Sequence, residues 1–265
     1  MNVIATGVVR KMRSRFHNPV SYSARLGDNE IALNPLLGNK VQLNFSGNIF
    51  CIECGRKTKK SFNQGYCYPC FKRLEQWFTC SIRPEKCRCQ DGDCIQSHVV
   101  YLANSSGLKV GITRMTQIPS RWIDQGATQA LAIIRVRSRL QSGELEMAFK
   151  QYVADKTNWR DMLKGKAAKL DMAGERDRLL AACEEDIKEL KARFGFPAIS
   201  ILKGIDPVSI DYPVEAYPEK ITSLNLDNEP VVSGILKGIK GQYLIFDSGV
   251  INLRRFSGYE VELQA

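Results

Sequence analysis

Cysteines are the residues whose type and spacing in this chain most clearly indicate chemistry. The chain has nine cysteines in 265 residues, and eight of them lie within residues 51–94. The stretch CIECGRKTKKSFNQGYCYPC contains two C-x2-C pairs, with Gly55 and Pro69 as turn residues, and each pair can offer two thiolates to one metal ion. This pattern predicts a structural zinc ion bound by Cys51, Cys54, Cys67 and Cys70.

A second cysteine group follows in CSIRPEKCRCQDGDC, where the spacing is less regular. We expect a second structural zinc ion here. Its ligands would be Cys80, Cys87, Cys89 and Cys94. His98 replaces Cys89 in an alternative ligand set, if Cys87 and Cys89 cannot both reach the metal. Cys183 lies apart from both groups in a helical pattern, where we expect a small core residue.

Cationic side chains are concentrated in and around the two cysteine groups. A module made rigid by zinc would present them together, in a form that suits the phosphates of a nucleic acid. We assign the aromatic residues between them to the core, because so small a module needs them there. The candidate nucleic-acid contacts are Lys57, Lys59, Lys60, Arg88 and, beyond the second group, Arg114.

The chain as a whole is basic and has a globular composition. Its 38 Lys and Arg residues outnumber its 28 Asp and Glu residues, so the formal net charge is +10. This excess favours a polyanionic partner, and nucleic acid, either DNA or RNA, is the leading candidate. No apolar run is long enough to cross a bilayer, and the N-terminus turns basic before a secretory core can form. We therefore expect a cytoplasmic protein with no membrane partner and no evident small-molecule cofactor.

The elements that must position these residues begin with a hairpin. HVVYLA and LKVGIT each indicate a strand, and NSSG between them is a turn cluster. Pro119 and Ser120 open a predicted helix, and LAIIRVRS predicts a third strand. In SGELEMAFKQYV, apolar residues at helical spacing predict a second helix with Glu146 on its flank. The predicted order is β-β-α-β-α.

The two ends of the chain resemble each other. Both contain alternating apolar residues and glycine-containing turns, which predict short antiparallel strands. At a constant offset, Ile31, Leu33, Gly38, Val41 and Leu43 match Ile251, Leu253, Gly258, Val261 and Leu263. We infer two related β-meanders that pack on each other as a barrel or sandwich and serve as a scaffold.

These patterns predict an α+β protein with five parts. Residues 1–50 and 201–265 form the meanders, residues 51–97 form the double zinc module, and residues 98–165 form the β-β-α-β-α domain. Residues 166–200 are predicted to contain an amphipathic helix that braces this domain. Its apolar face comprises Leu179, Leu180, Cys183, Ile187 and Leu190.

The central segment resembles the GIY-YIG endonucleases over roughly Val99 to Asn158. The family is named after two short motifs, GIY and YIG. The first corresponds to Val99-Val100-Tyr101 in this sequence and the second to Lys109-Val110-Gly111. The phrases RWIDQGA, GELE and TNWR follow in the order that the family shows. Two family residues are replaced, the first-motif glycine by valine and the second-motif tyrosine by lysine. The whole chain, with its cysteine groups, also resembles an uncharacterised bacterial protein family of unknown function.

The resemblance implies a metal-dependent endonuclease, a hydrolase that cuts the phosphodiester bonds of DNA or RNA. Its catalytic residues would be Tyr101, Lys109, Arg121, Glu146 and Asn158. Glu146 would bind Mg²⁺ or Mn²⁺, and Arg121 would pair with non-bridging phosphate oxygens. Tyr101 would orient or deprotonate the attacking water, assisted by the nearby cation of Lys109.

Two other classes of function are compatible with the same residues. One is a non-catalytic, zinc-containing nucleic-acid-binding protein. Its hairpin domain would contact a phosphate of the nucleic acid but would not hydrolyse the phosphodiester bond. The other is a protein-interaction scaffold built on the meanders and the charged helix. The candidate residues also have structural roles open to them: Tyr101 in a half-buried strand, Gly111 in close packing, and Arg121 and Glu146 as solvated charges. Glu144 competes with Glu146 from a different face of the helix.

Overall fold

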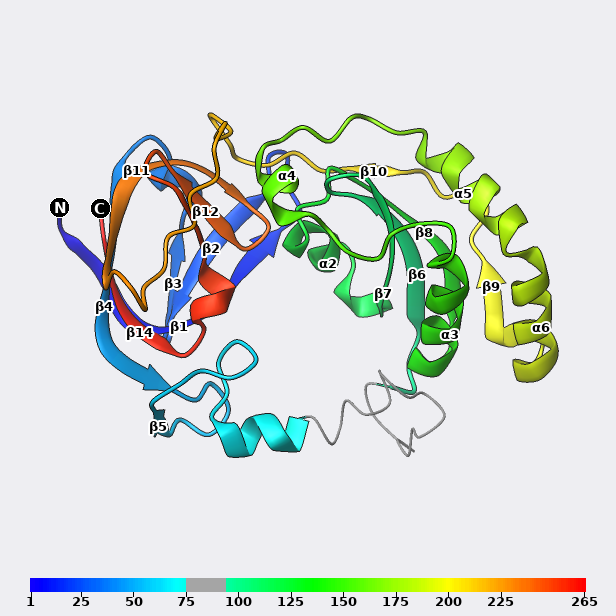
Figure 1. The fold of residues 1–265 in the computed structure, drawn as a ribbon, viewed down its shortest axis with the longest axis horizontal. Helices are drawn as coiled ribbons and strands as arrows, with labels where there is room; N and C mark the ends of the chain where they lie inside the picture. The colour runs from blue at the N-terminus through cyan, green and yellow to red at the C-terminus, as the bar shows by residue number, and fades with distance from the viewer. Residues whose placement is uncertain (75–93) are drawn as a thin grey trace. The chain divides into compact units, whose positions relative to one another are not determined.

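The structure is a computed structural model of the chain, and it describes residues 1–74 and 94–265 (Figure 1). These residues divide into two compact units. Unit 1 contains residues from both ends of the chain together with the first cysteine group, and unit 2 contains most of the middle of the chain. Helices and antiparallel strands are both present, so the predicted α+β class is confirmed.

Unit 1 is built on a curled antiparallel sheet of nine strands (Figure 1). The strand order is β13-β12-β11-β4-β14-β1-β2-β3, and β5 pairs with β4. The strands are β1 (Val3–Arg15), β2 (Ser21–Leu26), β3 (Asn29–Ala32), β4 (Lys40–Phe50), β5 (Lys57–Thr58), β11 (Val231–Lys240), β12 (Tyr243–Phe246), β13 (Val250–Asn252) and β14 (Tyr259–Gln264). Two short 3-10 helices precede β4 and β14, namely η1 (Asn34–Leu36) and η5 (Leu253–Phe256).

The strand order of unit 1 is symmetric about the β4–β14 pair. Leu43 pairs directly with Leu263, and these are matching positions in the two related ends of the sequence. Strands β1–β4 come from the N-terminal end of the sequence and strands β11–β14 from the C-terminal end. The last strand of each set pairs with the first strand of the other set, since β4 pairs with β11 and β14 pairs with β1. The two predicted meanders therefore interleave in one continuous sheet.

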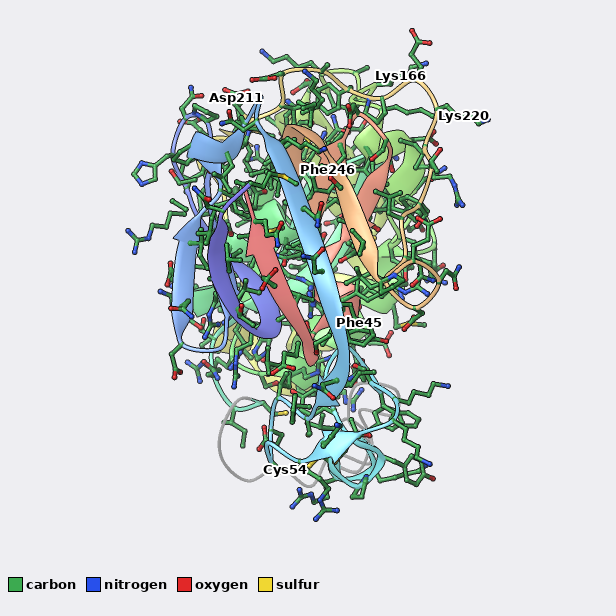
Figure 2. The ribbon with its side chains drawn as sticks, turned by 90° about the vertical axis from the view of Figure 1, so that its left-hand side faces the viewer. Phe45, Cys54, Lys166, Asp211, Lys220 and Phe246 are labelled. Atoms are coloured by element: carbon green, nitrogen blue, oxygen red, sulfur yellow. The ribbon has the colours of Figure 1, made fainter. Side chains whose placement is uncertain are left out.

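Burial alternates along the strands of this sheet, as a period of two requires. In β2, Tyr22, Ala24 and Leu26 are buried, while the residues between them are partly exposed. Figure 2 shows the sheet with its side chains, including Phe45 on β4 and Cys54 beyond the end of that strand. The apolar face of the alternating pattern forms the core, and the polar residues remain on the surface.

Unit 2 is a five-stranded antiparallel sheet combined with helices. Its strand order is β10-β8-β6-β7, and β9 pairs with β8. The strands are β6 (His98–Asn104), β7 (Leu108–Arg114), β8 (Gln129–Val136), β9 (Ile199–Ile201) and β10 (Val208–Ser209). The helices are η3 (Met115–Gln117), α2 (Ser120–Asp124), α3 (Arg139–Phe149), α4 (Trp159–Leu163), α5 (Met172–Ala182), α6 (Glu184–Phe194) and η4 (Phe196–Ala198).

The predicted order β-β-α-β-α is confirmed by β6, β7, α2, β8 and α3. Helix α3 begins at a capping box in which Ser138 and Gln141 satisfy each other's backbone N–H groups. Val100 packs in one core with Leu145 of α3. Because side chains alternate along a strand, Tyr101 lies on the opposite face of β6 from Val100.

The segment predicted as one bracing helix forms two helices, α5 and α6, which are separated only by Cys183. The backbone of Cys183 departs from helical geometry, with φ −101° and ψ 17°, although its side chain is fully buried. Leu179 and Ile187 lie in the same core as Cys183, so the predicted apolar face continues across the break. Within the described residues, the helices all fall short of the length and hydropathy that a membrane span requires.

Candidate functional site

The β6–β7 hairpin places two of the predicted site residues on one face. Tyr101 pairs with Gly111, and Ala103 pairs with Lys109, so Tyr101 and Lys109 lie near each other on the same side of the hairpin. Tyr101 is fully buried, and Lys109 is only 5% exposed. A Cβ atom at Gly111 would lie 2.6 Å from the phenol oxygen of Tyr101. The glycine of the second motif therefore makes room for the tyrosine of the first.

Helix α2 and the residue that follows it hold Tyr101 in place. The ring of Trp122 meets the ring of Tyr101 edge-on, with centroids 6.1 Å apart. Gln125 Nε2 donates a hydrogen bond to the phenol oxygen of Tyr101 at 2.7 Å. The guanidinium of Arg121 is close enough for its positive charge to lower the pKa of the same phenol. These contacts bring Arg121, which remains partly exposed, to the Tyr101–Lys109 face.

Helix α3 and the segment after it bring negatively charged side chains close to Tyr101 and Lys109. Glu146 lies on α3 and is partly buried. The backbone N–H of Val110 donates to the carbonyl of Ala154 at 2.8 Å, which ties the following segment to β7. The next residue, Asp155, forms an ion pair with Lys150 at 2.7 Å. Asp155 was not among the residues that the sequence pointed to.

These four groups act on one another's pKa values. Burial raises the pKa of Tyr101, and the charge of Arg121 opposes that rise. Burial, with a further contribution from Arg121, lowers the pKa of Lys109 to about 8 despite the carboxylates of Asp155 and Glu146. Burial also raises the pKa of Glu146, while nearby cations including Arg121 oppose the change. At neutral pH the phenol is therefore protonated, whereas Lys109 can lose its proton at mildly alkaline pH.

The structure thus brings together four of the five residues that the family resemblance marks as catalytic: Tyr101, Lys109, Arg121 and Glu146. The phenol and the ammonium are buried, while the guanidinium and the carboxylate keep part of their surface exposed. Among the described residues, the buried atoms Trp122 Nε1 and Gln125 Oε1 have no hydrogen-bond partner. The residues around Tyr101 therefore retain unused capacity to bind polar atoms.

Two other sequence candidates lie in different surroundings. Asn158 is exposed and precedes α4, where its Oδ1 accepts a hydrogen bond from the backbone N–H of Arg160 at 3.1 Å. Its Nδ2 donates to the carboxylate of Asp161, and these contacts are those of a helix cap. Glu144 forms an ion pair with Arg193 of α6 at 2.9 Å. These contacts of Asn158 and Glu144 are made outside the cluster of Tyr101, Lys109, Arg121 and Glu146.

A separate candidate centre in unit 1 is formed by the first cysteine group. The Sγ atoms of Cys51, Cys54, Cys67 and Cys70 all lie within 4.8 Å of one another. The Sγ atoms of Cys54 and Cys67 are 3.8 Å apart. Four thiolates that each lie about 2.3 Å from one ion are about 3.8 Å from each other in a tetrahedron. These four cysteines could therefore hold a zinc ion.

Local structure explains why the two thiols of the first cysteine pair lie close together. The backbone N–H of Gly55 donates to the carbonyl of Cys51 at 2.9 Å, which closes a tight turn. Gly55 has φ +69°, a conformation that residues with a side chain rarely adopt. Burial raises the pKa of Cys51, but backbone N–H groups of Cys54 and Cys67 outweigh it and lower the pKa to about 6. These backbone N–H groups therefore favour the thiolate form of Cys51, the form that binds a metal ion.

Of the second cysteine group, Cys94 lies within the described residues. Cys80, Cys87, Cys89 and the nearby Arg88 lie outside the described residues. Cys94 is partly exposed shortly before β6. His98 is buried at the start of β6, and its Nδ1 lies 2.7 Å from the carbonyl oxygen of Gln96. The second zinc site, with either ligand set, stays a prediction.

The other predicted nucleic-acid contacts lie on the surface. Lys57, Lys59 and Lys60 are exposed beside the first cysteine group, and the ammonium of Lys60 lies 5.6 Å from the ring centroid of Phe62. Arg114 is partly exposed at the end of β7. The lysines are therefore available to a partner of unit 1, whereas Arg114 belongs to the hairpin of unit 2.

Comparison with known proteins adds a family. Residues 38–261 match the model of a family whose description is "protein of unknown function (DUF2797)". The matched range includes both cysteine groups and the whole β-β-α-β-α segment. No curated protein and no solved structure matches the chain.

Proposed function

We propose that this chain, which belongs to the DUF2797 family of proteins of unknown function, is a metal-dependent endonuclease that hydrolyses phosphodiester bonds in a nucleic acid. The observation that carries the proposal is the convergence of Lys109, Arg121 and Glu146 beside the buried Tyr101. Three separate segments supply these side chains. Together they offer a cation for phosphate, a basic group and a metal-binding carboxylate. The motif residues that resemble GIY-YIG endonucleases support the same assignment.

Each side chain has a chemical role in this proposal. Arg121 pairs with non-bridging oxygens of the phosphate that is attacked. Lys109, in its neutral form, accepts the proton of the attacking water while the bond from phosphorus to the leaving oxygen breaks. Tyr101 stays protonated and orients the water through its phenol.

The divalent ion belongs at the two carboxylates. Glu146 would hold Mg²⁺ or Mn²⁺, hard ions that suit carboxylate oxygens combined with water and substrate oxygens. Asp155, whose charge also acts on Glu146 and which pairs with Lys150, would supply a second carboxylate to the same ion. When bound, such an ion neutralises charge on the phosphate and stabilises the leaving oxygen.

Cleavage and binding must be measured separately on the same variants. Wild-type protein should cut at least one member of a labelled panel of DNA and RNA oligonucleotides in Mg²⁺ or Mn²⁺. Glu146→Gln and Arg121→Ala should each slow cleavage by about 100-fold or more, and Glu146→Gln should bind as tightly as wild type. Glu144→Gln is the matched control, since Glu144 lies on the same helix but pairs with Arg193. A panel that wild-type protein leaves intact would refute the proposal.

A second candidate function is favoured by the burial of Tyr101. Its hydroxyl is covered by α2 and Gln125, and a lysine replaces the tyrosine of the second motif. In this alternative the chain is a non-catalytic nucleic-acid-binding protein, and the cluster holds a backbone phosphate without breaking a bond. Binding would then weaken in Arg121→Ala and with rising salt, and neither Mg²⁺ nor Mn²⁺ would produce cleavage.

We also propose that the two cysteine groups bind one structural zinc ion each. The spacing of the four thiols in the first group supports this proposal. A bound ion would fix the loops that carry Lys57, Lys59 and Lys60 and would hold these cations at the surface together. In this way the metal would organise a nucleic-acid contact without taking part in catalysis.

A further inference from the structure

Strands β1 and β2 carry several arginines on one face of unit 1. The residues that pair across these strands are Arg10 with Arg25, Arg13 with Ser23, and Arg15 with Ser21. Residues that pair directly in an antiparallel sheet lie on the same face. Arg10, Arg13, Arg15 and Arg25 therefore share one surface, which we call the arginine face.

A bulge in β1 gathers these arginines on one side. Positions 10 and 13 differ by three, and in a regular strand this spacing would put their side chains on opposite faces. The pairing of β1 with β2 shifts by one residue between Arg10 and Arg13. This shift leaves Val9 and Met12 both buried, while Arg10, Arg13 and Arg15 are all exposed.

Only part of the positive charge of the arginine face is paired with a carboxylate among the described residues. Arg10, Arg15 and Arg25 make no ion pair with a carboxylate among the described residues. Arg10 and Arg25 lie directly opposite each other, and like charges in this arrangement repel. A polyanion bound to this face would relieve that repulsion.

Two carboxylates on the strands around the arginine face are already engaged. Glu30 of β3 lies beside Arg25 in register, and its carboxylate pairs with Arg13 at 2.6 Å. Glu260 lies on β14, the other neighbour of β1, and accepts hydrogen bonds from Ser46 and Asn48. These carboxylates therefore leave most of the arginine face free for an external anion.

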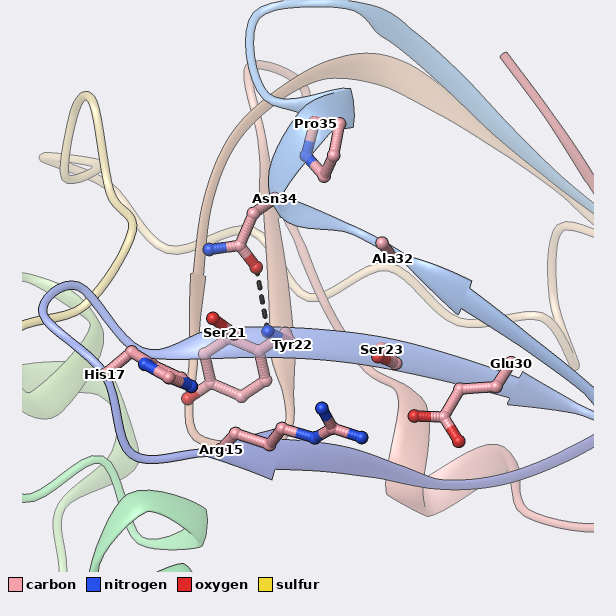
Figure 3. Close-up of a pocket in the computed structure, with 9 residues that line it drawn as sticks. All are labelled: Arg15, His17, Ser21, Tyr22, Ser23, Glu30, Ala32, Asn34 and Pro35. Carbon is pink, nitrogen blue, oxygen red and sulfur yellow. Dashed lines mark hydrogen bonds between the residues drawn. The ribbon is translucent and has the colours of Figure 1, made fainter.

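An open pocket of about 540 Å³ adjoins the arginine face (Figure 3). Its lining residues are Arg15, His17, Ser21, Tyr22, Ser23, Glu30, Ala32, Asn34 and Pro35. A guanidinium, an imidazole and two serine hydroxyls are thus available at one opening, and all of them can donate hydrogen bonds to anionic oxygens. The pocket extends the arginine face from β1 across β2 to β3.

We propose that the arginine face and its pocket bind the sugar–phosphate backbone of a nucleic acid. The guanidinium group of an arginine can donate two parallel hydrogen bonds to the oxygens of one phosphate, and serine hydroxyls commonly contact phosphates as well. The face runs from Arg10 to Arg15, roughly 16 Å along the strand, so it is too long for one free phosphate and suits a series of them. This surface lies in unit 1 and does not require the cluster of unit 2 to be catalytic.

The test is the binding of a labelled oligonucleotide, single-stranded or duplex, measured by fluorescence anisotropy at several salt concentrations. The variant Arg10→Gln/Arg15→Gln/Arg25→Gln removes three charges and leaves the pair of Arg13 and Glu30 intact. Its affinity should fall at least about 10-fold. The slope of log K against log salt should decrease by roughly 2 to 3, since each lost phosphate contact contributes about 0.7–0.9.

A matched control separates this surface from general charge. Arg135→Gln/Arg137→Gln/Arg160→Gln removes the same charge from three other exposed arginines that make no ion pair among the described residues, and it should change the affinity less than about 3-fold. Glu30→Gln should strengthen binding, because it releases Arg13. If the first triple variant unfolds in circular dichroism, the single exposed change Arg15→Glu takes its place and should lower the affinity alone.

Two results would overturn the proposal. Equal losses of affinity in the two triple variants would show that only the net charge of the chain matters. Loss of binding to an acidic peptide such as polyglutamate, with oligonucleotide binding unchanged, would assign the face to an acidic protein. The endonuclease proposal fails independently of this one, since a protein that binds through the arginine face but never cuts would leave this inference intact.

Discussion

Tyr101 faces Gly111 directly across the β6–β7 hairpin, and a Cβ atom at position 111 would lie 2.6 Å from the phenol oxygen. The missing side chain of Gly111 therefore leaves the space on the neighbouring strand that the phenol end of Tyr101 occupies. In that position the phenol accepts a hydrogen bond from Gln125 and lies close to Arg121. The packing of β6 against β7 thus places the phenol of Tyr101 close to the guanidinium of Arg121.

The Tyr101–Gly111 contact predicts the effect of a single methyl group. Gly111→Ala should lower the free energy of unfolding by about 1–3 kcal/mol, because the ring has to move from its place. Chemical denaturation measures this cost. In a Tyr101→Ala background the same change should cost much less, since the ring is absent. The same cost in both backgrounds would show that the glycine is needed for another reason.

The pH dependence of catalysis should report on Lys109. Its pKa is lowered from 10.5 to about 8, so the neutral form that accepts a proton dominates above about pH 8. The single-turnover rate of cleavage should therefore rise with pH up to about 8 and level off above it. Lys109→Arg stays charged and should lose this rise, together with about 100-fold in rate. Tyr101→Phe should keep the increase of the rate with pH. If Lys109→Arg shows the same pH profile as wild type, Lys109 is not the group that accepts the proton.

Lys240 predicts a second dependence on pH, in stability. Its side chain is fully buried, lies over the rings of Tyr212 and Tyr217 at 5.2 and 5.1 Å, and has no hydrogen-bond partner among the described residues. Burial lowers its pKa from 10.5 to about 8. Between these two values the unfolded chain binds more protons than the folded one, so the stability of wild type should rise as pH increases from about 8 to 10.5.

Replacing the buried ammonium tests that dependence. Lys240→Met should raise the free energy of unfolding at neutral pH by up to about 3 kcal/mol, because the charge no longer has to be buried. Urea denaturation at neutral pH and near pH 10 measures the gain, which should be much smaller at the higher pH. A gain that does not change with pH would mean that the ammonium is already accommodated.

Metal content tests the first cysteine group. Purified wild-type protein should contain zinc, and Cys54→Ser should contain about one equivalent less, because three thiolates no longer close the tetrahedron. Inductively coupled plasma mass spectrometry gives the count. Cys183→Ala is the control, since Cys183 is buried in the core of unit 2 and should leave the zinc content unchanged. Zinc-free wild-type protein would disprove the proposed ions.

Local patterns in the sequence were enough to predict several parts of the structure. The strands of the hairpin and the helix that begins after Pro119 follow from alternation and from helix-start residues within short windows. The two C-x2-C pairs predicted the approach of Cys51 and Cys67, because the geometry of a metal ion leaves few ways to combine such pairs. These features depend on neighbours in the chain and can be recognised without its fold.

The remaining features depend on contacts between distant segments. Alternation identified the strands that contain Leu43 and Leu263 but could not show that these residues pair, since pairing partners leave no local pattern. The arginine face depends on the bulge after Arg10, and strict alternation would have split it between two faces. Asp155 joined the candidate site only because a backbone hydrogen bond ties its segment to β7. The helical period continued through Cys183, so the break there was not visible in the pattern.

The measurement that tests the central claim most directly is mass spectrometry of an oligonucleotide incubated with wild-type protein and Mn²⁺ in water enriched in oxygen-18. In the proposed reaction, hydrolysis at the Arg121–Glu146 site would transfer one water oxygen to the phosphate at the cut. We therefore predict fragments whose new terminal phosphate carries a single oxygen-18 atom, and no such fragments with Glu146→Gln. Recovery of the intact oligonucleotide with wild-type protein, or labelled fragments in equal amount with Glu146→Gln, would contradict the account.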